Sequence, residues 1–174
     1  MHIQSLCHMR EFAKTLPVGV TVLDVGARAV DEHTSYRSMF KHCLYTGLDV
    51  TDGPNVDVVV KDPYKWPEVP SNSFDAVISG QCLEHVEYPW ETMREIARVV
   101  KPGGQVFIIV PHKWPLHYFP IDCWRFNPDG MDALGKWAGL DFEGADIHEI
   151  NHVEADIVAT YRRPNGTNET IGES

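Results

Sequence analysis

The feature that most constrains the fold is a series of short apolar runs separated by helical patterns and turn residues. The runs occupy residues 20–25, 44–49, 56–60, 75–79 and 106–110. Runs of this length with few polar residues are typical of strands buried on both faces, as in a parallel sheet. We therefore expect an α/β fold whose parallel strands are joined by right-handed crossovers.

Helical patterns and two further strands complete the expected architecture. Apolar residues recur at helical spacing in 4–16, 90–100 and 128–138, and weaker strand patterns occupy 141–149 and 154–161. The last two strands are close enough along the chain to pair antiparallel. The sequence thus predicts a doubly wound, Rossmann-like, mostly parallel seven-stranded sheet with an antiparallel last hairpin and helices on both faces.

Length and charge limit the organisation and the partners. The chain has 174 residues, which fits one domain over 1–163, with 164–174 expected to be a polar, flexible tail. A formal net charge of −10 argues against nucleic acid or an anionic membrane as the main partner. The four cysteines are scattered, and neither a signal peptide nor a membrane-spanning apolar run is found, so a cytoplasmic location is expected.

Polar residues follow the predicted strands at the ends where ligands of open α/β sheets bind. The first strand ends at Gly26, and Asp49 ends the second strand 23 residues later. An acidic residue at about this interval is typical of sheets that bind the ribose of a nucleoside. The third strand is followed by Asp62, and the fourth leads into Gly80. We expect these four points to meet at one crevice.

The strand ends belong to longer segments that read, in chain order, VLDVGA, YTGLDV, FDAVISGQCLEHV and REIARVVKPGGQVFIIVP. In this order they resemble the motifs of class I S-adenosylmethionine-dependent methyltransferases of the type 11 group. The resemblance is close over 20–111 and looser in the segment after it. It implies S-adenosylmethionine as the cofactor and methyl transfer, expected at oxygen, to a small-molecule or glycan-type acceptor.

The resemblance also implies roles for residues of the crevice. Gly26 would let the backbone approach the methionine end of the cofactor, Asp49 would bind the ribose, and Asp62 would reach the adenine amine. The expected cofactor-binding residues are Asp24, Gly26, Arg28, Asp49, Asp62, Pro63, Gly80 and Gln81.

The glycine loop departs from the GxGxG pattern of the family, because Arg28 and Val30 replace its second and third glycines. Side chains there leave less room for a cofactor and disfavour a positive φ. Two interpretations of Arg28 stay open. It either pairs with the cofactor carboxylate or faces solvent and reshapes the loop.

A hydroxyl acceptor must also lose a proton to a nearby base. The expected catalytic residues are His85, which follows the fourth strand, and His117 and Asp122 of the loop over 111–127. A structural role for His85 at the start of a helix is the alternative. The aromatic residues of the same loop either exclude water from an acceptor or form core beneath the last helix.

Metal binding is not expected at this site. In quinone O-methyltransferases of this broad class, a Glu three residues before a Glu-His pair helps to hold a divalent cation. Gln81 occupies that position here, and the histidine-rich segments show no tight zinc pattern.

Two other functions stay open as alternatives. One is a catalytically idle binding module with the methyltransferase fold, and the other is a metal-dependent enzyme that uses the histidine-rich loops. With the first strand near residue 20, the chain is expected to be close to a bare catalytic core. Its site would then be open to a bulky acceptor, or a second subunit of a homodimer would cover it.

Overall fold

The computed structural model describes residues 3–29 and 35–166. Val30 of the glycine loop and most of the expected tail lie outside the described residues. The elements, in chain order, are α1 (Ile3–Thr15), β1 (Thr21–Val25), η2 (Arg37–Met39), β2 (Leu44–Asp49), β3 (Val58–Val59), β4 (Phe74–Gly80), η3 (Leu83–His85), α2 (Pro89–Val99), β5 (Val100–Lys113), α3 (Pro128–Ala138), β6 (Asp141–Glu149) and β7 (Ala155–Arg162).

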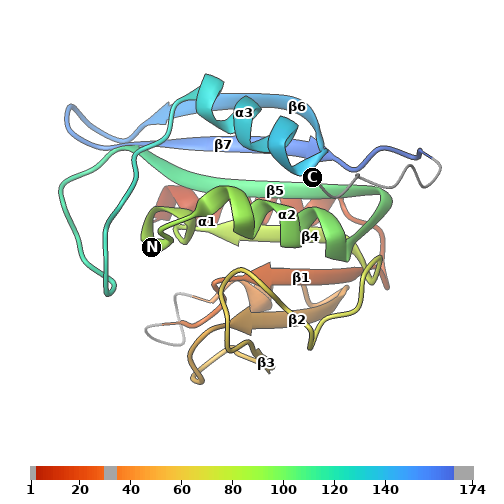
Figure 1. Cartoon of the computed structure of the whole chain (residues 1–174). Helices are drawn as coiled ribbons and strands as arrows, with labels where there is room; N and C mark the ends of the chain where they lie inside the picture. Colours follow the sequence, from red (N-terminus) through yellow and green to blue (C-terminus); the bar gives the residue numbers. More distant parts are fainter. Residues whose placement is uncertain (1–2, 30–34, 167–174) are drawn as a thin grey trace, which may run out of the picture.

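The strands form one seven-stranded sheet in the order β3-β2-β1-β4-β5-β7-β6 (Figure 1). The first five strands pair in parallel, whereas β7 runs antiparallel to both β5 and β6. The chain leaves the centre of the sheet after β1, builds one edge with β2 and β3, and returns at β4 to build the other. The predicted fold class is confirmed, including the antiparallel last hairpin.

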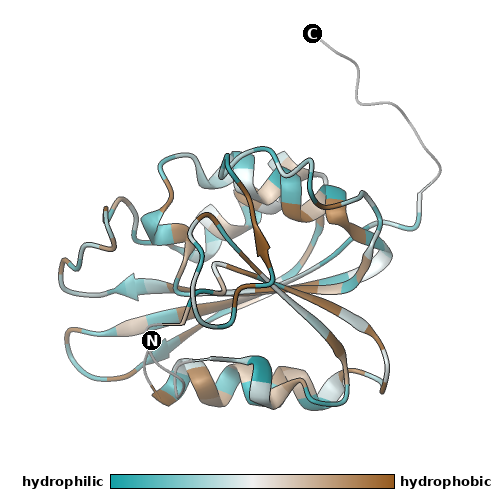
Figure 2. Cartoon of the chain, turned by 90° about the horizontal axis from the view of Figure 1, so that it is seen from below, coloured by the Kyte–Doolittle hydropathy of each residue, from teal (hydrophilic) through white to brown (hydrophobic). Residues whose placement is uncertain are grey.

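Helices cover both faces of this sheet. Figures 1 and 2 show α1 alone on one face and α2 and α3 together on the other. On the α1 face the Phe12 ring stacks on Phe107 of β5 with 4.3 Å between ring centroids. On the opposite face Met93 and Ile96 of α2 are fully buried in the larger core. Apolar residues are needed on both faces of the central strands, which explains why their sequence shows no alternation.

The strand bounds differ from the sequence prediction mainly in β5. Residues 101–104 contain Pro and two Gly and predict a turn, but β5 begins at Val100, directly after α2. Val100 pairs with Phe74, and an irregularity follows before Ala76 pairs with Gln105. Residues 101–104 themselves pair with no residue of β4, and Gly103 and Gly104 instead exchange hydrogen bonds of 2.9 Å with Arg163, directly after β7. Among the described residues, no helix combines the length and the apolar character needed to cross a bilayer.

Candidate functional site

The carboxyl ends of β1, β2 and β4 lie at one edge of the sheet, beside a cavity of about 800 Å³. Val25 of β1 pairs with both Leu48 and Ser79, so the three strands end level with one another. This edge is where the strand order reverses, which is the usual ligand-binding position in such sheets. The expected site residues that line the cavity are Gly26, Arg28, Asp49, Pro63, Gly80, Gln81, His85 and His117.

Gly26 forms a turn that no other residue fits well. Its φ is +79°, and its N–H donates to the Leu48 carbonyl at 2.9 Å. A Cβ atom at this position would lie 2.4 Å from Sγ and 2.6 Å from Cβ of Cys82. Close approach of the cofactor is the reason expected from the sequence for this glycine. The structure adds that Cys82 packs against the same turn.

Asp49 is fixed at the cavity wall by two backbone donors. The N–H of Arg28 donates to its Oδ2 atom, and the N–H of Thr51 donates to its Oδ1 atom, both at 3.0 Å. Each carboxylate oxygen accepts up to two hydrogen bonds, so both keep capacity for a ligand hydroxyl. The Arg28 side chain passes along Gly53, where its Nε atom would be 2.9 Å from an added Cβ.

Asp24 lies beneath the glycine turn and outside the cavity lining. It is buried, and its Oδ2 atom accepts a short hydrogen bond from the Tyr45 hydroxyl. Burial raises the pKa of Asp24 to about 7, with the Tyr45 hydrogen bond acting in the opposite direction. Asn55 connects the Tyr45 hydroxyl to the Ala27 carbonyl through its amide. Asp24 therefore supports the glycine turn from below, and direct contact of Asp24 with a cofactor stays a prediction.

Asp62 also lies outside the cavity lining, whereas Pro63 and Tyr64 contribute to it. The Asp62 side chain is exposed, and its Oδ1 atom accepts the Tyr64 N–H at 2.8 Å. This bond closes a turn that places the Tyr64 ring at the cavity. The expected contact of Asp62 with adenine remains a prediction.

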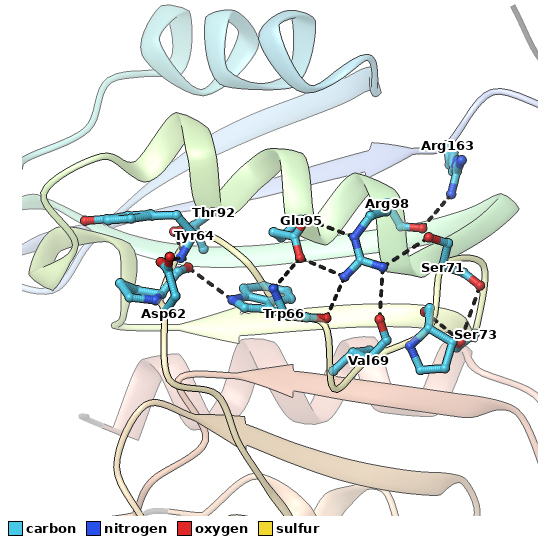
Figure 3. Close-up of polar contacts among 12 residues, drawn as sticks. Asp62, Tyr64, Trp66, Val69, Ser71, Ser73, Thr92, Glu95, Arg98 and Arg163 are labelled. Atoms are coloured by element: carbon cyan, nitrogen blue, oxygen red, sulfur yellow. Dashed lines mark hydrogen bonds and ion pairs between the residues drawn. The ribbon is translucent and has the colours of Figure 1, made fainter. Parts of the chain in front are cut away.

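Arg98 of α2 holds the loop that carries this turn (Figure 3). Its guanidinium donates to the backbone carbonyls of Trp66 at 3.0 Å and Val69 at 2.9 Å. It also donates to Ser71 Oγ at 3.0 Å and to Glu95 at 2.7 Å. Since loops have few backbone partners of their own, one planar cation with several donors fixes the position of this wall of the cavity.

Gly80 and Gln81 form the floor between β4 and the next turn. A Cβ atom at Gly80 would lie 2.1 Å from the Tyr36 hydroxyl oxygen, so only glycine fits there. Gln81 has a φ of +56°, and its N–H donates to the Ile109 carbonyl at 2.8 Å. The side-chain Nε2 of Gln81 is buried and has no hydrogen-bond partner among the described residues. The site therefore holds an unused donor at the cavity.

Glu84, His85 and His117 form a cluster beside the cavity, which the two histidines line. One oxygen of Glu84 and one nitrogen from each ring lie within 4.8 Å of one another. The His85 and His117 rings are nearly perpendicular, with centroids 4.9 Å apart. Burial raises the pKa of Glu84 to about 8 and lowers the pKa of His85. The structure thus brings together two of the three expected catalytic residues.

Asp122, the third expected catalytic residue, supports this cluster from behind. Its buried carboxylate accepts two hydrogen bonds from Arg125, at 2.6 and 2.8 Å, and the N–H of His117 at 2.8 Å. The Arg125 guanidinium holds the pKa of this carboxyl well below its usual range, although burial opposes the effect. Asp122 is therefore placed to position His117 rather than to touch a ligand in the cavity.

Aromatic and aliphatic side chains of the loop after β5 also line the cavity, and they include Trp114, Tyr118, Phe119 and Ile121. Tyr118 and Phe119 are 68% and 53% exposed, so they form the mouth of the cavity and not the core. Phe126, by contrast, is buried in the core. The core interpretation therefore holds for Phe126, whereas a role of the exposed rings in excluding water from an acceptor stays a prediction.

Several groups at the cavity were not predicted from the sequence. Tyr64 and Cys82 directly follow Pro63 and Gln81, so adjacency to predicted residues is the one signal that could have found them. Nothing in the spacing places His117 beside His85. The later histidine-rich segment, around His148, forms no three-ligand group among the described residues.

Comparison with known proteins identifies a family for more than half of the chain. A family model described as a methyltransferase domain, type 11, matches residues 14–108. Two curated relatives share 30–31% identity. One is the ubiquinone biosynthesis O-methyltransferase of Saccharophagus degradans, over 43% of this chain. The other is the 27-O-demethylrifamycin SV methyltransferase of Amycolatopsis mediterranei, over 56% of this chain. The match spans 37% of the length of each relative.

Solved structures share the fold at low sequence identity. The 1,6-didemethyltoxoflavin-N1-methyltransferase of Burkholderia thailandensis superposes with a TM-score of 0.73 at 16% identity. The superposition covers 92% of this chain and 78% of that one. That enzyme was solved with 1,6-didemethyltoxoflavin and S-adenosylhomocysteine bound.

Proposed function

The chain belongs to the type 11 methyltransferase domain family, and from that premise we propose that it transfers a methyl group from S-adenosylmethionine to a hydroxyl of a small-molecule acceptor. One observation carries the proposal. One cavity is lined both by Asp49 at the end of β2, which suits a ribose, and by His85 and His117, which suit an acceptor.

The residues at the sheet edge fit this cofactor. Asp49 keeps acceptor capacity for ribose hydroxyls after its two backbone bonds are counted. Gln81 presents a buried amide N–H₂ with no other partner among the described residues, which suits the carboxylate of the methionine moiety. Tyr64 and Pro63 offer an apolar wall for the adenine ring. When bound, the cofactor supplies a methyl group on a positively charged sulfur.

The protein's main contribution to this reaction is positioning. A nucleophile must approach the methyl carbon in line with the bond that breaks, and a fixed geometry supplies much of the rate. The loop with Trp114, Tyr118 and Phe119 lies over the acceptor end of the cavity and excludes water there. The Arg98 network keeps the opposite wall in place, so the two ligands meet at a constant distance.

His85 is the group we assign to the acceptor proton. Its Nδ1 atom is 2.6 Å from the Ile121 carbonyl oxygen, which only accepts hydrogen bonds. Nδ1 therefore carries the ring proton, and Nε2 is left with a free lone pair. The acceptor hydroxyl would give its proton to Nε2 as the oxygen attacks the methyl carbon.

Two curated relatives favour oxygen as the acceptor atom, because their names describe methylation at oxygen in those proteins. A third, from Coxiella burnetii and 26% identical over 62% of this chain, is named a C-methyltransferase, so an acceptor carbon is the competing outcome of the acceptor panel. The exposed aromatic rings at the cavity mouth suit a flat ring or the face of a sugar, so a glycan-type acceptor fits as well as a small aromatic one. The alternative function, an idle binding module, would bind the cofactor equally but give no product with any acceptor.

Calorimetric titration with S-adenosylhomocysteine tests the cofactor site. Asp49→Asn should weaken binding about 10–100-fold, because it removes charge-assisted hydrogen bonds to the ribose. Asp52→Asn is the matched control, since Asp52 lies in the next turn, is exposed and does not line the cavity. Equal affinity of the two variants would contradict the assignment. Turnover of an acceptor panel then separates an enzyme from an idle module.

A further inference from the structure

Glu84 is a fully buried acid in the short turn after β4. Its side chain has no exposed surface, and neither carboxylate oxygen has a hydrogen-bond partner among the described residues. Buried polar atoms in folded proteins nearly always have partners, so an unsatisfied carboxylate needs an explanation. Either the group holds a proton, or a cation belongs next to it.

The two neighbouring imidazoles are oriented as metal ligands usually are. Histidines that bind metals donate their second N–H to a carbonyl or carboxylate, which fixes the ring and its tautomer. His85 does so through Nδ1 to the Ile121 carbonyl at 2.6 Å. His117 has Nδ1 at 3.3 Å from the Pro115 carbonyl and 3.6 Å from Asp122.

One nitrogen of each ring and one oxygen of Glu84 form a compact donor set. His85 Nε2 is 3.7 Å from Glu84 Oε1, and the three donor atoms lie within 4.8 Å of one another. Donors at about 2.0–2.1 Å from a tetrahedral ion are about 3.4 Å apart. Side-chain rotations that shorten the longest separation between donors from up to 4.8 Å to about 3.4 Å would therefore complete the coordination. In the part of the chain that the structure describes, this is the one such group.

We propose that Glu84, His85 and His117 form a binding site for a divalent transition metal of the Zn²⁺ type, with an open coordination position toward the cavity. Two imidazoles and one carboxylate favour Zn²⁺ or Co²⁺, whereas Mg²⁺ prefers oxygen ligands alone. Three protein ligands are typical of zinc sites that keep a position open for water or a substrate.

The metal would act on the acceptor. An oxygen bound at the open position has a lowered pKa, so a hydroxyl acceptor would lose its proton to water more easily. His85 Nε2 is a ligand in this state and a base in the metal-free protein, and both states remove the same proton. This use of the metal rests on the proposed function, but the binding site itself does not.

Titration of EDTA-stripped, buffer-exchanged full-length protein with Zn²⁺ in a calorimeter tests the site. We expect one Zn²⁺ per chain and no binding of Mg²⁺. His117→Ala should weaken Zn²⁺ binding about 100-fold or more, because loss even of an outer partner costs 10–100-fold. Glu84→Gln should have a similar effect. His152→Ala is the control and should stay within about twofold, since His152 is exposed in the β6–β7 turn.

Absorption spectra with Co²⁺ test the ligand set separately. Nitrogen and oxygen ligands give visible bands without a thiolate charge-transfer band, whereas a thiolate band would assign the metal to a cysteine such as Cys123 and overturn the proposal. Wild-type affinity in His117→Ala would overturn it too. Because His117 is partly exposed on a loop, this variant is expected to fold, and its melting temperature checks that.

The same samples distinguish failure of this site from failure of the proposed function. Binding of S-adenosylhomocysteine in EDTA without any binding of Zn²⁺ would overturn the metal site and leave the methyltransferase proposal standing. Binding of Zn²⁺ that depends on His117, without any binding of S-adenosylhomocysteine, would overturn the methyltransferase proposal and leave the metal site standing.

Discussion

Replacing Gly26 by alanine separates two costs that the structure assigns to the turn after β1. The first is backbone strain at a φ of +79°, which costs a residue with a Cβ atom about 1–2 kcal/mol. The second is overlap with Cys82, since the new Cβ would lie 2.4 Å from its Sγ atom. Overpacking of this kind costs about 1–3 kcal/mol. We expect Gly26→Ala to lower the free energy of unfolding by about 2–5 kcal/mol.

A double-mutant cycle assigns the two parts. In a Cys82→Gly background the overlap is absent, so Gly26→Ala should cost only the strain of about 1–2 kcal/mol. Denaturant titration of the four proteins measures the difference, and the single variant should also melt roughly 5–15 °C below the wild type. An equal cost of Gly26→Ala in both backgrounds would refute the argument that Cys82 limits this turn.

Three further predictions concern stability and the acceptor. Partial burial raises the pKa of Asp75, but hydrogen bonds from Lys101 and Thr21 outweigh it and lower the pKa to about 2. This carboxylate therefore stabilises the fold above pH 4, and the effect fades as pH falls toward 2. Because the group is partly exposed, solvent screening reduces this stabilisation, and Asp75→Asn should lower the free energy of unfolding by about 1 kcal/mol at pH 6 and by less at pH 3. Urea titrations at the two pH values measure this, and an equal loss at both would contradict the prediction. Arg98→Met should lower the free energy of unfolding by about 2 kcal/mol and weaken the binding of S-adenosylhomocysteine. Arg94→Met on the same helix is the control and should change neither quantity, which thermal melts and calorimetry would measure. Tyr118→Ala should raise the KM for the acceptor several-fold with cofactor affinity unchanged, which steady-state kinetics would test.

The sheet was predictable from the sequence because burial dictates its pattern. Strands β1 and β4, with neighbours on both sides, have continuous apolar runs that local inspection finds. The predicted ranges for β6 and α3 match the structure at both ends. The bounds of α3 were predictable because the helix starts at a proline and Gly139 follows its last residue. The early start of β5 could not be predicted, because Gly103 and Gly104 bond to Arg163, a residue far away in the sequence.

The site was only partly predictable, for a different reason. Asp49 and Gly26 lie at fixed positions relative to strand ends, so order and spacing locate them. His117 belongs to a loop whose course depends on its N–H donating to Asp122 and on Arg125 donating to the Pro115 carbonyl, and loops have no periodicity from which to infer neighbours. The burial of Glu84 likewise arises from tertiary packing, because the acid follows an ordinary leucine in a short turn.

The central claim is that the cavity at the ends of β1, β2 and β4 holds the cofactor. A crystal structure of the protein with S-adenosylhomocysteine tests it most directly. We predict density for the ribose at the Asp49 carboxylate, for the methionine moiety at Gln81, and for the adenine ring beside Tyr64. Density elsewhere on the chain, or an empty cavity at millimolar ligand, would contradict the account.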